Sequence, residues 1–225
     1  MTGTGRPAAE GVAPGHFPGP PVAAGHVAPC PRRLRAHDDA GPALDTTRAH
    51  YVWEHPYYPQ YAVPRADLAD RLAARSRALP AGVDLPGHVV VPLHDDVAWF
   101  EEAEPVHGHP RSPYVRVDAL RTDRTVTVRV PGSRVTLARS SAAVAVFETG
   151  LPPRWYLDPT TVDRSLLTPS DTVTRCPYKG VTTGWWSTSG IADVAWTYGA
   201  PTTALAAIAE LIAFDDTRLE VTVDP

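Results

Sequence analysis

Five consecutive residues, Cys176-Pro177-Tyr178-Lys179-Gly180, combine a thiol, a phenol and an amine with two residues that shape the backbone. A strand buried in a hydrophobic core has no need of this combination, whereas a ligand site could use every group in it. A thiol beside an ammonium group can act as a nucleophile, because the positive charge favours the thiolate. The pentapeptide is therefore the first place in the chain where we expect chemistry.

Three residues are candidates for acid–base catalysis, namely Glu148, Asp171 and Lys179. A partly buried lysine would need a carboxylate partner, and such a pair can bind a polar ligand or transfer a proton. Glu148 closes an apolar run and has a counterpart in Glu54. Each candidate also has a structural interpretation. Lys179 could form a structural ion pair, Glu148 could anchor a turn, and Cys176 could be a small buried apolar residue.

Aromatic residues and an arginine surround the pentapeptide in the sequence. Aromatic walls with a few polar groups are typical of small-molecule sites. Trp185 and Trp186 are adjacent, so on a strand they face opposite ways and one of them could line a pocket. The predicted ligand-binding residues are Arg154, Tyr156, Cys176, Tyr178, Trp185, Trp186 and Tyr198.

Metal and cofactor motifs are weak in this sequence. The two histidines of His107-Gly108-His109 could bind a metal ion, and metal-assisted hydrolysis through them is a further alternative function. The Gly and Pro residues around them favour a loop instead. There is no Gly-rich loop after a strand and no phosphate-binding Lys-Ser pair, which argues against an ATP or NAD enzyme. We predict neither a metal nor a cofactor.

Composition limits the class of protein. A chain of 225 residues with 43% apolar and 20% charged residues suits one large or two small globular domains. The net charge of −4 and the absence of a basic stripe exclude nucleic acid as an expected partner. No apolar run reaches the ~20 residues that span a bilayer. With no signal-peptide pattern and only two cysteines, we expect a cytosolic protein without a structural disulfide.

Organisation along the chain is predicted from composition and internal similarity. Residues 1–32 are rich in Pro, Gly and Ala without a hydrophobic period, so we expect a disordered tail. The remainder contains four similar blocks in the same order at offsets between 93 and 97, which predicts two tandem units over residues 33–123 and 124–225. The matched blocks are Ala43–Glu54 with Leu137–Glu148, Tyr61–Pro64 with Tyr156–Pro159, Val97–Trp99 with Val194–Trp196, and Thr125–Val130 with Arg218–Val223.

Most local patterns predict strands. Thr125–Val130 alternates polar and apolar residues, and after a Pro-Gly turn Arg134–Ala138 returns, which predicts a hairpin. Ala142–Phe147 is a short apolar run that suits a strand buried on both faces. Helical spacing occurs at Pro64–Leu79 and Ala204–Phe214. The expected fold is mainly β, with two small barrel-like or tent-like units and about one helix each.

The C-terminal half resembles the family called domain of unknown function 427. The similarity covers about residues 124–225 and is carried by Phe147–Tyr156, Thr168–Thr172, Cys176–Gly180 and Ala195–Tyr198. The N-terminal half looks like a diverged first copy, through Trp99–Glu102 and Gly108–Asp118. The resemblance implies a compact β fold with a central groove, similar to the tent-like barrels. A nucleotidyltransferase label has been attached to the family, but no Gly-Ser followed by paired aspartates occurs here to support it.

The two halves differ at the pentapeptide, because residues 79–86 of the first half contain nothing similar to it. We therefore predict that a pocket of the second unit binds a small polar molecule, with Tyr178 and a tryptophan orienting it. Whether the molecule is also transformed is left open by these residues. The alternative is a non-catalytic structural or protein-interaction module, in which the pentapeptide is a turn that locks the second unit.

Overall fold

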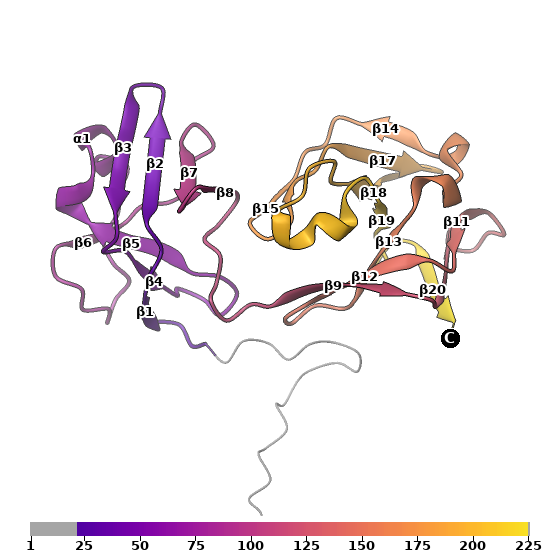
Figure 1. The fold of residues 1–225 in the computed structure, drawn as a ribbon, viewed down its shortest axis with the longest axis horizontal. Helices are drawn as coiled ribbons and strands as arrows, with labels where there is room; N and C mark the ends of the chain where they lie inside the picture. Colours follow the sequence, from indigo (N-terminus) through magenta and orange to yellow (C-terminus); the bar gives the residue numbers. More distant parts are fainter. Residues whose placement is uncertain (1–21, 225) are drawn as a thin grey trace, which may run out of the picture. The chain divides into compact units, whose positions relative to one another are not determined.

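The computed structural model describes residues 22–224, which form two compact units (Figure 1). The N-terminal unit comprises residues 22–114 together with residues 174–181, and the C-terminal unit comprises residues 115–173 and 182–224. The segment 174–181 contains the pentapeptide. It therefore belongs to the second half of the sequence but to the N-terminal unit of the structure.

Short antiparallel strands build the N-terminal unit. They form two four-stranded sheets, in the orders β1-β4-β5-β6 and β3-β2-β7-β8, and the separate hairpin β15-β16. The strands are β1 (Val27–Pro29), β2 (Leu34–Asp38), β3 (Gly41–Thr46), β4 (His50–Val52), β5 (Gln60–Pro64), β6 (His88–Val90), β7 (Ala98–Glu101), β8 (Glu104–Val106), β15 (Arg175–Cys176) and β16 (Gly180–Val181). A 3-10 turn, η1 (Arg65–Asp67), and the single-turn helix α1 (Asp70–Ala73) follow β5.

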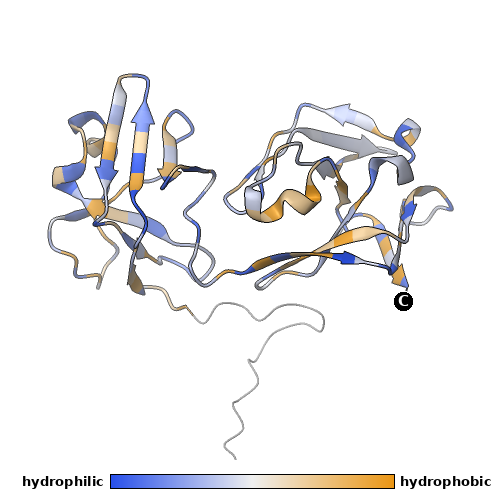
Figure 2. Ribbon diagram, in the orientation of Figure 1, coloured by the Kyte–Doolittle hydropathy of each residue, from blue (hydrophilic) through white to orange (hydrophobic). Residues whose placement is uncertain are grey.

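The core of this unit is rich in large aromatic side chains. Tyr51, Trp53 and Tyr61 are among its largest fully buried residues. Along β2, Leu34 and Ala36 are buried while Arg35 and His37 are partly exposed, and the hydropathy of these residues alternates along the strand in Figure 2. Alternation of this kind buries one face of a strand and leaves the other to water.

The C-terminal unit contains a seven-stranded sheet, in the order β14-β17-β18-β19-β13-β12-β9, and a three-stranded sheet, β11-β10-β20. The strands are β9 (Val117–Thr122), β10 (Thr125–Arg129), β11 (Thr136–Ser140), β12 (Ala143–Glu148), β13 (Arg154–Leu157), β14 (Thr168–Ser170), β17 (Gly184–Thr188), β18 (Ile191–Thr197), β19 (Ile212–Phe214) and β20 (Glu220–Asp224). The 3-10 turns are η2 (Pro159–Thr161), η3 (Arg164–Leu166) and η4 (Thr203–Ile208).

Two predicted features of this unit are confirmed. The hairpin predicted around Pro131-Gly132 is the antiparallel pair β10 and β11. The apolar run predicted as a strand is β12, which pairs with β13 on one side and β9 on the other. Nearly all of its residues are buried, and it is mostly orange in Figure 2.

The two units share the same order of strand pairing. The order β1-β4-β5-β6 of the N-terminal unit recurs as β9-β12-β13-β19, and β3-β2-β7 recurs as β11-β10-β20. The register recurs as well, since His50 pairs with Ala62 and Val144, 94 positions later, pairs with Tyr156. Both β2 and β10 carry a register shift at the corresponding place. This agrees with the predicted match of Ala43–Glu54 to Leu137–Glu148, while duplication as its origin stays a prediction.

Two of the four predicted block matches are wrong. Thr125–Val130 and Arg218–Val223 are not equivalent segments, because β10 and β20 pair with each other in one sheet. Trp99 lies in β7, whose counterpart by pairing order is β20, whereas Trp196 lies in β18. The C-terminal unit has additional strands, β14, β17 and β18, between η3 and β19. Short apolar fragments such as Val-Ala-Trp recur without marking equivalent positions.

The predicted barrels and the predicted extent of the tail need correction. Every sheet in residues 22–224 has two open edges, so none of them closes into a barrel. The tail was expected to reach residue 32, but Val27–Pro29 forms β1 and Cys30 is 2% exposed. The rest of the predicted tail, residues 1–21, lies outside the described residues. The division at residues 114 and 115 also precedes the boundary predicted at 123 and 124.

Both predicted helices are largely absent. In Pro64–Leu79 only η1 and the single turn α1 form, because Leu68 is extended and makes an isolated β-bridge with Leu44. In Ala204–Phe214 the 3-10 turn η4 ends at Ile208, and Ile212–Phe214 becomes β19. Pairing with neighbouring strands outweighs local helix propensity at both places. Within the described part of the chain, no helix has the length and apolar character needed to cross a membrane.

Candidate functional site

A buried carboxylate on β7 is the centre of the polar site in the N-terminal unit. Side chains alternate along this strand, so Trp99 and Glu101 face inward while Ala98 and Phe100 are more exposed. Glu101 is 3% exposed. A buried carboxylate is costly unless charged and hydrogen-bonding partners compensate it, so its partners decide whether it is tolerated.

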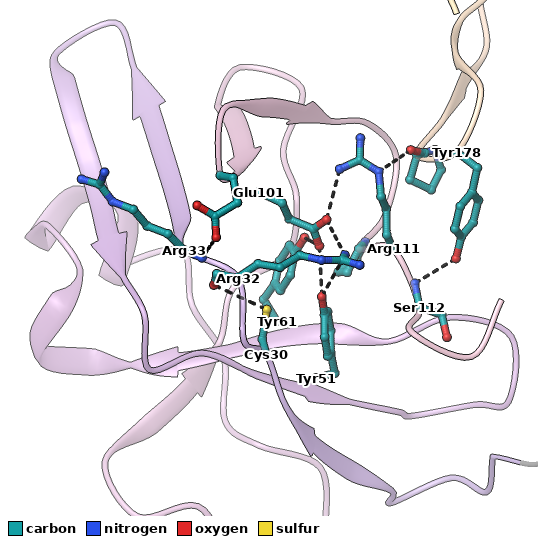
Figure 3. A network of polar contacts seen from close by, with 12 residues as sticks. Cys30, Arg32, Arg33, Tyr51, Tyr61, Glu101, Arg111, Ser112 and Tyr178 are labelled. Atoms are coloured by element: carbon teal, nitrogen blue, oxygen red, sulfur yellow. Dashed lines mark hydrogen bonds and ion pairs between the residues drawn. The ribbon is translucent and has the colours of Figure 1, made fainter. Parts of the chain in front are cut away.

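Four side chains donate hydrogen bonds to Glu101 (Figure 3). Arg32 Nη1 and Arg111 Nη1 donate to Oε2, at 2.7 and 3.1 Å. The hydroxyls of Tyr61 and Tyr51 donate to Oε1, at 2.7 and 3.2 Å. Both carboxylate oxygens are therefore satisfied twice, and two positive charges face one negative charge.

The two tyrosines remain proton donors at neutral pH. Burial raises the pKa of Tyr61 well above its ordinary value, and the charge of Glu101 adds to the effect. Burial also raises the pKa of Tyr51. A protonated phenol is needed to donate to a carboxylate, and these shifts keep both phenols protonated around neutral pH.

Arg111 joins the Glu101 network to the pentapeptide. Its Nε donates to the carbonyl of Pro177 at 2.7 Å, and its Nη2 donates to the carbonyl of Pro105 at 2.7 Å. The next residue, Ser112, donates its backbone N–H to the Tyr178 hydroxyl at 2.8 Å. A planar guanidinium can make three such bonds in fixed directions, which an ammonium group cannot do. Arg111 thus connects Glu101, β8 and the hairpin.

The pentapeptide forms the tight turn of the hairpin β15-β16. Cys176 pairs with Gly180, and Pro177–Lys179 makes the three-residue loop between them. Gly180 has φ of +105°, a conformation that favours glycine. Burial raises the pKa of Tyr178 to about 12. The turn predicted as the structural alternative is therefore present, but it belongs to the N-terminal unit and not to the second unit that it was expected to lock.

A groove of about 650 Å³ lies in the N-terminal unit beside β7 and β8. Trp99, Phe100 and Val106 supply apolar wall, and His94 and His107 supply imidazoles. The hairpin contributes Arg175 and Val181 to the lining. Its size and mixed lining are within the range of small-molecule sites.

Two residues that line this groove each have a buried side-chain nitrogen without a hydrogen-bond partner among the described residues. The nitrogens are Nε1 of Trp99 and Nε2 of His94. Trp99 is 2% exposed, so water cannot easily compensate its N–H. Buried polar atoms are nearly always paired in native proteins, and an unpaired one needs an explanation. A ligand in the groove would be one if the side chains that cover these nitrogens moved aside.

The structure distributes the predicted catalytic residues over different units. Glu148 is buried at the end of β12, and Asp171 is exposed after β14, both in the C-terminal unit. Lys179 lies in the turn of the hairpin, in the N-terminal unit. The structure therefore does not assemble the three within one unit, and their catalytic roles stay predictions.

The predicted ligand-binding residues fall into three places. Cys176 and Tyr178 lie in the hairpin, whereas Tyr156, Trp186 and Tyr198 are buried in the cores of the C-terminal unit. Core packing is the direct explanation for these last three.

Arg154 and Trp185 meet around a third side chain, Trp196. The Arg154 guanidinium carbon lies 5.3 Å from the Trp196 ring centroid, and the Trp185 and Trp196 centroids are 5.1 Å apart. Arg154 also forms an ion pair with Asp216 at 2.7 Å, and the Trp185 indole N–H donates to the Thr182 hydroxyl at 2.9 Å. These partners account for both residues without a ligand.

Sequence reasoning missed most of the N-terminal site. Arg32, Tyr51, Tyr61, Glu101 and Arg111 come together from positions up to 79 apart in the chain, and no local pattern connects them. A signal was nevertheless present, because Glu101 and Arg111 lie in Trp99–Glu102 and Gly108–Asp118, the two segments on which the first half was predicted to be a diverged copy.

The His107-Gly108-His109 segment does not form a recognisable metal centre. In residues 22–224 no group of three or more His, Cys, Asp or Glu side chains is arranged to hold a metal ion. His109 instead stacks on Tyr58, with ring centroids 4.2 Å apart. Burial lowers the pKa of His109 and, with Arg111 and Arg175 adding to it, the pKa of His107.

We expect these two histidines to make the N-terminal unit sensitive to mild acid. Their folded-state pKa values lie below the ordinary 6.5, so the unfolded chain takes up protons first as the pH falls. Their contribution to stability is complete above pH 6.5 and is lost as the pH falls from 6.5 through the folded-state pKa. A His109→Phe variant keeps the stacking and should reduce this loss by up to about 1.4 kcal/mol per pH unit.

Hydrogen exchange of peptides from each unit between pH 7 and 5, corrected for the intrinsic rate, measures this effect. All 9 histidines precede residue 110, so the C-terminal unit has none and is the internal control. An unchanged pH dependence of the N-terminal peptides in His109→Phe would show that this ring does not carry the sensitivity.

Comparison with known proteins adds one match. The family model described as Domain of unknown function (DUF427) matches residues 118–225, just under half of the chain. The matched stretch includes the hairpin, so the part of the sequence that is similar to this family supplies residues 174–181 to the N-terminal unit. No curated protein matches the chain.

Proposed function

We propose that the protein binds a small polar molecule in the groove of the N-terminal unit beside β7 and β8. The observation that carries this proposal is that Trp99 and His94, which line the same groove, each have a buried side-chain nitrogen without a partner among the described residues. A ligand with a hydrogen-bond acceptor would satisfy the indole N–H after a small adjustment of the side chains around it. The size of the groove, about 650 Å³, suits a metabolite.

The hairpin has a part in this proposal as a wall of the groove. Arg175 and Val181 line it, and the contacts of Arg111 and Ser112 hold the turn between them. Binding therefore uses residues from both halves of the sequence. This replaces a pocket built by the second half alone, and catalysis by Glu148, Asp171 and Lys179 is not required.

A second candidate function is a non-catalytic interaction module. The observation that favours it is the satisfied state of Glu101, whose four donors leave it nothing to offer a ligand. On this view the Glu101 network and the docked hairpin only make the unit rigid, and the surface binds another protein.

A thermal-shift screen against metabolites, sugars and nucleotides tests the proposal, with Trp99→Phe and Trp185→Phe run in parallel. Both variants remove one indole N–H, but Trp185 lies in the C-terminal unit and its N–H is already bonded to Thr182. We expect a compound that raises the Tm of the native protein and of Trp185→Phe, with a clearly smaller shift for Trp99→Phe. No active compound, or equal shifts in both variants, would favour the interaction module.

A further inference from the structure

We infer that an aromatic surface of the N-terminal unit binds the proline-rich residues 14–21 of the same chain. The surface consists of rings from three segments that the fold brings together, namely His26, His55, Tyr57, Tyr58, His109 and Tyr114. None of these rings lines the groove beside β7 and β8, so the aromatic surface is separate from the proposed ligand site.

The rings of the aromatic surface contact one another and are open to solvent. Tyr58 stacks on His109 with ring centroids 4.2 Å apart, and His55 meets Tyr58 edge-on at 4.4 Å. Tyr57 and Tyr114 are 76% and 42% exposed, and in residues 22–224 no other tyrosine, tryptophan or phenylalanine is classed as exposed. One exposed ring needs no explanation, but both exposed tyrosines beside partly exposed rings form a surface that suits apolar ring-shaped groups.

The described part of the chain begins beside this surface. The Gly25 N–H donates to the Trp53 carbonyl at 2.7 Å, at the start of the loop between β4 and β5 that carries three of the rings. The His26 ring lies 5.1 Å from the Trp53 ring, and its Nε2 is 3.0 Å from the Tyr114 hydroxyl. Pro21 precedes Gly25 by four positions, which span at most about 14 Å. Residues 14–21 therefore start within reach of the rings.

The composition of residues 14–21 matches what an aromatic surface binds. The segment reads Pro-Gly-His-Phe-Pro-Gly-Pro-Pro, with proline at four of its eight positions. Proline fixes φ near −65°, and proline-rich segments favour the polyproline II helix, which has three residues per turn. In that helix Pro18 and Pro21 share one face, about 9 Å apart. Aromatic surfaces bind this helix well because it is already formed and loses little entropy on binding.

The same chain is favoured as the source of the bound segment. A segment joined to its binding surface through a short connection has an effective concentration in the millimolar range. Even a weak interaction is largely saturated at that concentration. A proline-rich segment of another protein would have to displace residues 14–21 before it could bind.

Nuclear magnetic resonance of the full chain labelled with 15N tests this binding from the side of the segment. Gly19 has an amide proton, and aromatic rings close to it move its signal away from the random-coil position. We expect this displacement in the native protein and in the control Leu120→Ser, which replaces a 56% exposed side chain of the C-terminal unit. Tyr57→Ser should lower the ratio of bound to free segment about tenfold, as for an aromatic side chain that is central to an interface.

The same experiment tests the binding from the side of the surface. Replacing Pro18 and Pro21 by glycine removes two rings and the preference for the polyproline II helix. We expect the amide signals of His55 and Tyr57 to move in this double variant. They should stay in place in Pro7→Gly, which changes a proline outside residues 14–21.

Three results would overturn the inference. A random-coil signal for Gly19 in the native protein would show that the segment is not bound. Equal effects of Tyr57→Ser and Leu120→Ser, or of the double proline variant and Pro7→Gly, would show that the aromatic surface is not what binds it. Loss of the Gly19 displacement on dilution of the native protein would show that a second copy supplies the segment. None of these results bears on the groove, which the screen with Trp99→Phe tests separately.

Discussion

Replacing Glu101 by glutamine is expected to lower the free energy of unfolding of the N-terminal unit by about 3 kcal/mol. Removing one partner of a buried ion pair typically costs about 3–5 kcal/mol, because the other charge is left uncompensated. Here two arginines and two tyrosine hydroxyls would face a neutral amide whose NH2 group repels the arginine donors. We take the low end because the Arg32 side chain is 37% exposed and water can solvate part of its charge.

Glu102→Gln is the matched control for this variant. It removes the same charge from the adjacent residue, whose side chain is exposed and accepts one hydrogen bond from the backbone N–H of Arg33 at 2.8 Å. We expect its effect to stay within about 1 kcal/mol. Urea unfolding measures the loss of stability of each variant. Hydrogen exchange of peptides from each unit then shows which unit is destabilised. Equal effects of the two variants would show that the buried network does not stabilise the fold.

Replacing Arg111 by methionine is expected to free the hairpin in the N-terminal unit. The variant keeps most of the aliphatic stem but removes bonds to the Pro177 carbonyl, the Pro105 carbonyl and Glu101. Loss of charge-assisted hydrogen bonds costs about 1.5–3 kcal/mol each at most, and part of this is regained when water solvates the exposed groups. We expect the open population of the hairpin to rise about 10- to 100-fold, since 1.4 kcal/mol corresponds to a factor of ten.

The chain offers an unusually direct measurement of this opening. Because Lys179 is the only lysine, a lysine-specific protease has a single site, in the turn of the hairpin. The rate of this single cut, followed by intact mass under native conditions, reports the open population when opening is fast relative to cleavage.

Arg116→Met controls for the loss of an arginine as such, because its side chain is 78% exposed and pairs with Asp118 at the surface. Arg111→Met should be cut faster at Lys179, while Arg116→Met should be cut like the native protein. If Arg111→Met is cut at the native rate, contacts other than those of Arg111 hold the turn. The wall that the hairpin gives to the proposed groove would then not depend on the Glu101 network.

The local sequence determined the class of structure and the most unusual segment. Thr125–Val130 alternates polar and apolar residues, which is the pattern of a half-buried strand. Ala142–Phe147 is continuously apolar, which is the pattern of a strand buried on both faces. Such patterns depend only on neighbouring residues. The match of Ala43–Glu54 to Leu137–Glu148 also identified strands that hold the same place in the pairing order of their units. The pentapeptide was recognised because its residue types are unusual for a core, which needs no knowledge of the fold.

Tertiary structure decided where these pieces lie and what surrounds them. Glu101 is compensated by Arg32, 69 positions earlier, and Arg111 reaches Pro177, 66 positions later. Contacts of such separation leave no periodic trace in the sequence, so neither the buried network nor the placement of the hairpin in the N-terminal unit could be predicted. The helix predicted over Ala204–Phe214 also fails to form because of distant contacts. Its last residues gain backbone hydrogen bonds from β13 and β18, and that pairing outweighs a local helical spacing.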